Sequence, residues 1–263
     1  MQLLYDLYMQ PTHDEKCIPK IHEIVLDAMK KSGYKYIIDD KNNMFLFHDD
    51  TKCKTLLCAH MDMVKTGNPI VEVVHHNGIL FGVDEDFHQT SCGADDKNGV
   101  WLCIKAALES GVLPSILLVA HEEGAPHTVE DWLDDEGNKQ LLKYYDNCLV
   151  LDRANDKEII YAGSWNTYSG ILACQWKSIN KDWEFKKGVM CDADRLIKHI
   201  PTINLSIGYY NGHMPSEFTM LDELLTTKDA LFKFLNAKNK NHIDWDIIKE
   251  FDNIIRGDKK WQY

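Results

Sequence analysis

The chain has 263 residues, 44% of them hydrophobic and 27% charged, which is enough to bury one sizeable core and unlike a disordered protein. Its 29 Lys and Arg residues against 41 Asp and Glu residues give a net charge of −12, which argues against a nucleic-acid-binding surface. No apolar run approaches the ~20 residues that span a membrane, and the start of the chain lacks the basic segment of a signal peptide. The eight cysteines are scattered, without the close pairs of a metal or redox motif. We therefore expect a cytoplasmic protein with reduced cysteines and without membrane or nucleic-acid partners.

The first half of the chain alternates helical and extended patterns. Apolar residues at helical spacing predict helices over 3–8 and 18–29. Two β-type runs at 34–39 and 44–49 predict a hairpin, and the uninterrupted apolar run 55–59 predicts a strand buried on both faces. Asn77-Gly78 predicts the turn of a second hairpin within 70–83, and a helix follows from Gly93 to Gly111.

The second half continues in the same way. The expected elements are a buried strand at 115–120, a helix around 129–145, a strand at 148–151, short β-like runs within 158–176, a helix near 192–199, a strand at 202–210 and a helix over 221–235. Residues 236–241 are expected to link to a last amphipathic helix. Alternating strands and helices predict an α/β fold in which helices flank a mostly parallel central sheet, and we expect one domain over 1–263.

Chemically reactive side chains follow nearly every predicted strand. Because parallel strands place their ligands beyond their carboxyl ends, we expect these side chains to meet at one edge of the sheet. They are His60, Asp62, Asp95, Asp96, Glu122, Glu123, Asp152 and His213. Carboxylates gathered in one place repel each other unless cations neutralise them. Two divalent ions would balance three ligand carboxylates and one hydroxide, so the sequence predicts a dinuclear metal site.

Spacing suggests a division of work among these residues. His60 and Asp62 are two apart, so in an extended chain they share a side, and one can bind a metal while the other orients it. Asp95 lies in a glycine-bounded segment from which a carboxylate could bridge two ions. Of Glu122 and Glu123, one can ligate while the other accepts a proton from metal-activated water and returns it to a leaving amine.

Five segments in this order resemble the co-catalytic zinc exopeptidases, in wording closest to the peptidase T and zinc aminopeptidase branches. They are HMD (60–62), GADDKNG (93–99), HEEG (121–124), LDR (151–153) and GYYNGHMPSEF (208–218). The resemblance covers roughly residues 56–220. It implies a three-layer, phosphorylase/hydrolase-like α/β fold, two zinc ions and a short peptide as substrate. Cobalt and manganese tolerate similar mixed ligand sets.

The resemblance also implies roles for single residues. Carried over motif by motif, one ion would be held by His60, Asp95 and Asp152, and the other by Asp95, Glu123 and His213. Asp62 would orient His60, and Glu122 would be the general base. A cis peptide bond is implied between Asp95 and Asp96.

The chain departs from many relatives in length between these motifs. Only 61 positions separate Asp152 from His213, and 35 separate His60 from Asp95, too few for the lid or dimerisation domains that relatives insert there. We therefore expect the catalytic domain without such an insertion, and substrate selection or assembly inferred from those domains cannot be transferred.

Substrate-binding residues are less clearly indicated. Arg153 could bind a substrate carboxylate bidentately, Asp192 falls where relatives place an acidic residue near the site, and Glu217 follows the last histidine. The favoured function is aminopeptidase action on short peptides. The alternatives are a deacylase of N-acyl amino acids, which could use the same metals and base, and an inactive binding protein that keeps the fold. The sequence does not indicate an oligomeric state.

Overall fold

The computed structural model describes residues 1–13, 15–124, 126–161, 167–188, 191–238 and 243–259. Its helices are α1 (Gln2–Tyr8), a short 3-10 helix (Glu15–Cys17), α2 (Ile18–Met29), α3 (Ala94–Glu109), α4 (Thr128–Asp134), α5 (Glu136–Leu142), α6 (Thr167–Ile179), α7 (Asp192–Leu196), α8 (Leu221–Asn236) and α9 (Trp245–Lys259). Part of the expected linker at 236–241 lies outside the described residues. None of the described helices is both long enough and apolar enough to cross a membrane.

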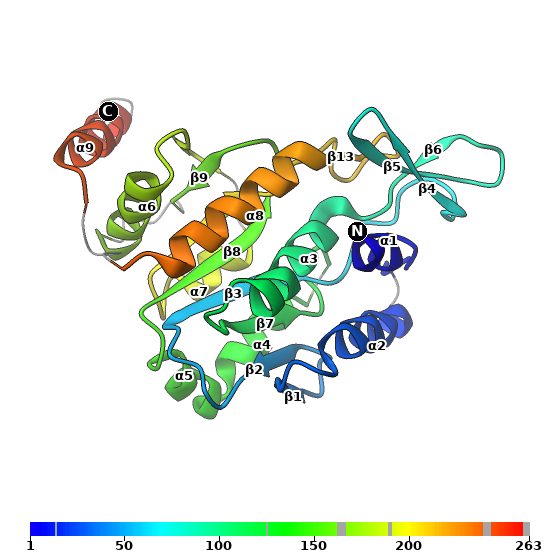
Figure 1. The fold of residues 1–263 in the computed structure, drawn as a ribbon, viewed down its shortest axis with the longest axis horizontal. Coiled ribbons are helices and arrows are strands. Elements are labelled where there is room, and N and C mark those ends of the chain that lie inside the picture. The colour runs from blue at the N-terminus through cyan, green and yellow to red at the C-terminus, as the bar shows by residue number, and fades with distance from the viewer. Residues whose placement is uncertain (14, 125, 162–166, 189–190, 239–242, 260–263) are drawn as a thin grey trace.

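A large mixed sheet forms the centre of the molecule (Figure 1). In spatial order its strands are β1 (Lys35–Ile38), β2 (Met44–Phe47), β7 (Ser115–Val119), β3 (Thr55–His60), β8 (Asn147–Arg153), β11 (Thr202–Ser206), β9 (Glu158–Ile160) and β10 (Glu184–Lys186). The four central strands β7, β3, β8 and β11 are parallel. At the edges, β1 pairs antiparallel with β2, β2 with β7 and β9 with β11, whereas β10 pairs parallel with β9. The predicted fold class is therefore confirmed.

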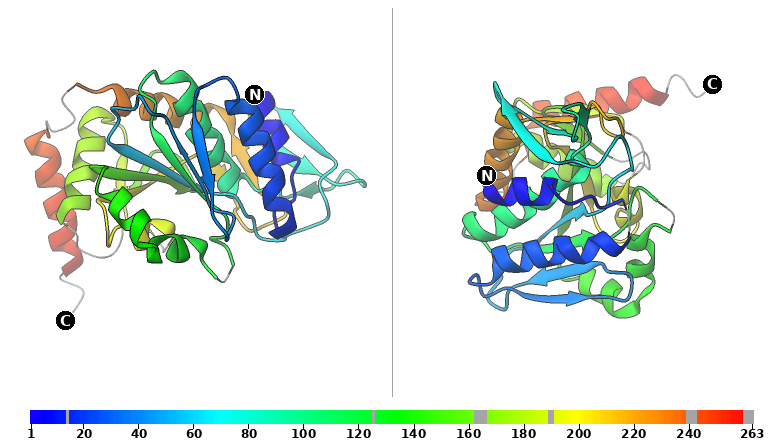
Figure 2. Two further views of the ribbon diagram at one scale, coloured as in Figure 1. Left: turned by 90° about the horizontal axis from the view of Figure 1, so that it is seen from below. Right: turned by 90° about the vertical axis from the view of Figure 1, so that its right-hand side faces the viewer.

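Helices cover both faces of this sheet, as the views in Figure 2 show. Leu57 of β3 and Leu149 of β8 belong to a core shared with α1, α2, α3, α6 and α8. Their neighbours Leu56 and Cys148 belong to a second core shared with α4, α5 and α7. Successive strand residues point to opposite faces, so a strand between two helical layers must be apolar throughout. This explains why every residue of β3 is buried.

A second, smaller sheet contains the predicted hairpin around Asn77-Gly78. Its strands are β12 (Tyr209–Tyr210), β13 (Phe218–Met220), β5 (Ile79–Val83) and β4 (Glu72–His76), with β6 (Gln89–Thr90) paired to β5. The hairpin turn has positive φ at both Asn77 and Gly78, as a tight hairpin requires. Leu80 of β5 pairs with Thr219 of β13, so this sheet connects the chain before Asp95 with the chain after His213.

The helix expected around 129–145 is two helices, which corrects that expectation. Asp135 has extended backbone angles and its side chain accepts a hydrogen bond from the Asn138 backbone N–H, so it ends α4 and caps α5. An aspartate in this position satisfies a free N–H of the following helix, which favours a new start over a continuous helix.

Two further expectations about strands are wrong. In the described part of 158–176, which leaves out 162–166, β9 is the one strand. The apolar run at the end of this range is part of α6, where Leu172, Ala173 and Trp176 are buried while Ile171 is 41% exposed. This burial follows a helical period. The strand expected at 202–210 breaks at Gly208, whose φ is +73° and where a Cβ would lie 2.8 Å from the Leu224 backbone nitrogen. The chain changes there from the large sheet to the small one.

We predict that a buried hydrogen-bond network between α1, α3 and β13 stabilises the fold. The Tyr8 hydroxyl donates to Asn98 Oδ1 and lies 2.7 Å from Thr219 Oγ1, and all three residues are fully buried. Tyr8→Phe should lower the free energy of unfolding by about 1–3 kcal/mol, because the buried Asn98 oxygen loses a donor. Urea denaturation measures this. Tyr36→Phe is the matched control, because Tyr36 is 51% exposed. Equal stabilities for the two variants would contradict the prediction.

Candidate metal centre

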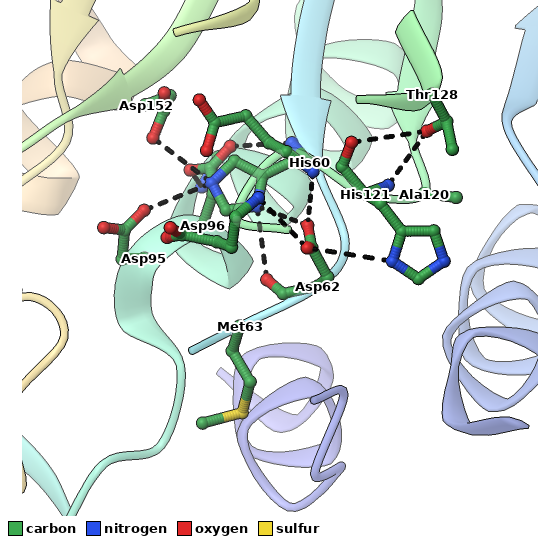
Figure 3. A network of polar contacts seen from close by, with 12 residues as sticks. His60, Asp62, Met63, Asp95, Asp96, Ala120, His121, Thr128 and Asp152 are labelled. Atoms are coloured by element: carbon green, nitrogen blue, oxygen red, sulfur yellow. Dashed lines mark hydrogen bonds and ion pairs between the residues drawn. The ribbon is translucent and has the colours of Figure 1, made fainter. Parts of the chain in front are cut away.

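The register of the central strands brings the first two predicted ligands together. Cys58 of β3 pairs with Val150 of β8, so His60 and Asp152, each two residues further on, leave the sheet side by side on the same face. His60 Nε2 lies 3.4 Å from Asp152 Oδ1 (Figure 3). The strand β3 also pairs with β7, with His60 opposite Val119, so the turn carrying Glu122 and Glu123 emerges beside them.

Asp95 lies between the two predicted ion positions. Its Oδ1 is 3.2 Å from His60 Nε2, and its Oδ2 is 3.3 Å from His213 Nε2. Two donor atoms that bind the same zinc ion, each at ~2.1 Å in tetrahedral geometry, are about 3.4 Å apart. The two separations therefore fit one ion shared by Asp95 and His60 and another shared by Asp95 and His213. His213 Nε2 is also 2.6 Å from Glu123 Oε1. The five predicted ligands therefore converge from five separate stretches of chain.

The cis peptide bond implied between Asp95 and Asp96 is present. Both carboxylate oxygens of Asp96 accept backbone hydrogen bonds: Oδ2 accepts one from the His60 N–H at 3.0 Å, and Oδ1 accepts one from the Gly99 N–H at 3.1 Å. A Cβ at Gly99 would lie 2.0 Å from the Leu151 carbonyl oxygen, so only glycine lets α3 approach β8 this closely.

Asp62 contacts the backbone of the turn at Glu122 and Glu123 as well as the His60 imidazole that the sequence indicated. Its Oδ1 is 3.1 Å from His60 Nδ1, as expected for the residue that orients this imidazole. The same carboxylate accepts hydrogen bonds from the backbone N–H groups of Glu122, at 2.9 Å to Oδ1, and Glu123, at 3.1 Å to Oδ2. Asp62 therefore fixes the turn that carries both glutamates. His121 Nδ1 approaches the carboxylate from the far side, at 3.8 Å (Figure 3).

The cluster is crowded with charge and mostly buried. His60, Asp62 and Asp95 are 2%, 4% and 7% exposed, whereas the His213 side chain is 50% exposed. Burial raises the pKa of Asp152 to about 8, although its hydrogen bond with His60 opposes this. Burial alone would lower the pKa of His60, but hydrogen bonds to Asp152, Asp62 and Asp95 raise it well above its usual value. Without cations, the cluster therefore retains protons.

The donor set fits divalent cations. Two groups of side chains have ligand atoms that all lie within 4.8 Å of one another, namely His60 with Asp96 and Asp152, and His60 with Asp95 and Glu123. Asp96 falls in the first group by distance, but both of its oxygens already accept backbone hydrogen bonds. Asp95 has an oxygen directed at each histidine, so it is the better candidate for a shared ligand. Mixed imidazole and carboxylate donors suit zinc.

The predicted substrate-binding residues lie next to this cluster. Arg153 follows Asp152, but its Nε is 2.9 Å from Glu158 Oε2, so the guanidinium is held in an ion pair. Asp192 begins α7 and is 2% exposed, and its Oδ1 has no hydrogen-bond partner among the described residues. Burial, followed by the charges of Glu122 and Asp152, raises the pKa of Asp192, while His60 and Arg195 oppose this. Substrate binding by either residue stays a prediction.

Sequence reasoning missed Tyr209, which lies beside the cluster. The ring is 6% exposed, and burial, followed by the charges of Asp95 and Asp152, raises its pKa well above the usual value. A Cβ at Gly212 would lie 2.8 Å from this ring and 3.1 Å from Asp95 Oδ2. The signal in the sequence was its position in the segment before His213. An aromatic residue there is explained equally well by packing in the core.

No known protein family matches the chain in sequence, and no curated protein does. Among solved structures, the tripeptidase of Staphylococcus aureus superposes with a TM-score of 0.70 at 13% identity over 89% of this chain and 96% of its own. The aminopeptidase PepT of Bacillus cereus gives 0.68 at 14% identity, over 88% and 96%. A TET aminopeptidase of a marine-sediment Thaumarchaeota archaeon gives 0.63 at 12% identity, over 95% and 98%. The chain has the fold of these peptidases, which confirms the fold implied by the sequence resemblance.

We predict that zinc displaces protons from the metal-free cluster. The carboxyl of Asp152 has a pKa near 8, and hydrogen bonds to Asp95 and Glu123 raise the pKa of His213 to about 10, so both hold protons at about pH 7. Ligands must lose these protons to bind metal, so zinc affinity should rise with pH up to those values. Calorimetric titration in buffers of different ionisation enthalpy measures the release. A binding enthalpy independent of the buffer would contradict the prediction.

Proposed function

We propose that this chain is a metal-dependent peptidase that removes the N-terminal residue from short peptides, with two zinc ions in the candidate centre. The observation that carries the proposal is the separation of donor atoms around Asp95, with His60 at 3.2 Å from one oxygen and His213 at 3.3 Å from the other. The proposal agrees with the activities named for proteins of the same fold, an aminopeptidase, a tripeptidase and a TET aminopeptidase.

The ligands divide into two sets around Asp95. One ion would be held by His60, Asp152 and Asp95 Oδ1, and the other by Glu123, His213 and Asp95 Oδ2. When bound, the ions would polarise a substrate carbonyl and lower the pKa of a water molecule. The side chains of this chain then have to supply position and proton transfer.

Glu122 is the proposed general base. Its backbone N–H donates to Asp62, in the same turn as Glu123, so the two glutamates start from one fixed anchor. Burial raises the pKa of Glu122, and the charges of Glu123 and Asp95 add to this while His60 opposes it. A carboxyl whose pKa is raised can accept a proton from attacking water and give it to the departing amine. Among the described residues, the Glu122 side chain has no hydrogen bond or ion pair that assigns it a structural role instead.

The charges around the centre favour binding of the N-terminal ammonium group of a peptide over binding of a substrate carboxylate, and so favour aminopeptidase action. Asp192 adds a buried carboxylate near Glu122 and Asp152, whereas Arg153 is paired with Glu158. The ammonium group of a peptide bound beside Asp192 would favour the charged form of this carboxyl, which burial disfavours. A deacylase acting on N-acyl amino acids is the second candidate, since the same ions and base would serve any amide bond.

A substrate panel tests the reaction class. The zinc-loaded protein is incubated with a free tripeptide, the same tripeptide acetylated at its N-terminus, and an N-acetyl amino acid, and products are measured by mass spectrometry. We expect the N-terminal residue to be released from the free tripeptide alone. Hydrolysis of the N-acetyl amino acid alone would establish the deacylase instead. No hydrolysis of any of the three would favour a binding protein.

Replacement of the proposed base separates chemistry from metal binding. Glu122→Gln should lower kcat by about 10²–10⁴-fold, because it removes proton transfer while keeping the shape of the side chain. The zinc content, measured by atomic absorption, should stay that of the unmodified protein. Glu136→Gln is the control, because the Glu136 side chain is 77% exposed and belongs to α5. An unchanged kcat in Glu122→Gln would overturn the role of Glu122.

A further inference from the structure

A buried glutamate outside the ligand set connects two parts of the candidate centre. Glu217 lies four residues after His213, in the turn that leads to β13, and is 1% exposed. Its side chain is directed at residues 91–95, the loop that enters α3. Asp95 falls within the bounds of α3, but its backbone angles are not helical, so it is counted here with this loop. Among the described residues, Glu217 forms no hydrogen bond with the side chain of a predicted metal ligand. Its contact with Asp95 is made through the Asp95 backbone N–H.

The Glu217 carboxylate accepts hydrogen bonds only from this loop among the described contacts. Oε2 accepts from Ser91 Oγ at 2.8 Å and from the Ala94 backbone N–H at 2.9 Å, and Oε1 accepts from the Asp95 N–H at 3.4 Å. Ser91 Oγ in turn accepts from the Gly93 N–H at 3.1 Å. The carboxylate therefore fixes the backbone of the loop up to Asp95 itself.

The backbone of Glu217 fixes the other side of the contact. Its N–H donates to the Met214 carbonyl at 3.0 Å, which closes the turn next to His213, and its own carbonyl accepts from Gln89 Nε2 at 3.0 Å. The turn with His213 and the loop with Asp95 are thus held together through one residue. Their two metal-binding groups end 3.3 Å apart.

A carboxylate is an unfavourable choice here unless its position is useful. It adds negative charge to a site that already contains Asp95 and Glu123, and a buried charge costs free energy unless hydrogen bonds compensate for it. A side chain with two acceptor oxygens can accept hydrogen bonds from the Ser91 hydroxyl and from the Ala94 and Asp95 N–H groups at the same time. Glutamine has the same shape but would direct an NH₂ group at one of those donors.

We infer that Glu217 is a positioning residue for one of the two ions, the ion assigned to Asp95, Glu123 and His213. The inference rests on the proposed dinuclear function. His60 and Asp152 leave paired strands, so the spacing of their ion is set by the sheet. His213 leaves an exposed turn with positive φ, so its distance from Asp95 depends on contacts such as those of Glu217.

Metal titration of two variants tests this inference. Zinc binding is followed by calorimetry with a competing chelator, which gives a separate affinity for each ion. In Glu217→Gln we expect one of the two zinc affinities to fall by about 10–100-fold and the other to change by less than about threefold. Ser91→Ala removes a donor from the other side of the same contact and should weaken the same ion by a smaller factor, with non-additive effects in the double variant.

The matched control is Glu223→Gln. Glu223 lies in α8 and accepts a hydrogen bond from the hydroxyl of Tyr210 in β12, at 2.8 Å. It has no hydrogen bond with the loop at 91–95 among the described residues. It should leave both affinities unchanged. Equal weakening of both ions in Ser91→Ala or Glu217→Gln, or two unchanged affinities in Ser91→Ala, would overturn the inference. If the unmodified protein itself binds fewer than two ions, the proposed function fails instead.

Discussion

The candidate centre depends on the register of β3 between β7 and β8. A shift of one residue would turn every side chain of β3 to the other face and move His60 away from Asp152. The apolar side chains of β3 prevent this shift, because Leu56 and Leu57 fit different helical layers on the two faces. Packing in the core therefore fixes the position of a polar group at the end of the strand.

Charge is the second constraint, and Asp62 shows how the fold accommodates it. Burial alone would raise the pKa of Asp62, but hydrogen bonds from His121 and His60 and the N–H of Glu122 hold it below its usual range. Asp152 has fewer such donors, and its pKa rises. One buried carboxylate thus remains charged and organises the turn, while its neighbour requires a proton or a cation.

The sequence predicted those features that local patterns determine. The buried strand β3, both hairpins and the meeting of candidate ligands at the strand ends follow from runs of apolar residues, from Asn77-Gly78 and from the order of the motifs. It failed where local preference was ambiguous, as in the apolar run of α6, or where one residue changes the direction of the chain, as Asp135 and Gly208 do. The contacts of Glu217 with Ser91 and Ala94 join residues more than 120 positions apart, and no local pattern indicates such pairs.

The two proposed ion positions are built from different kinds of structure. His60 and Asp152 extend from strands buried between two helical layers, so their positions are supported by the whole core. His213 is half exposed on a turn, and its partner Asp95 lies in a loop that enters α3. A ligand on a strand takes its backbone position from the sheet, whereas ligands on a turn and a loop must have their backbone held by specific hydrogen bonds. The buried polar residues around the loop at 91–95 are best understood as that support.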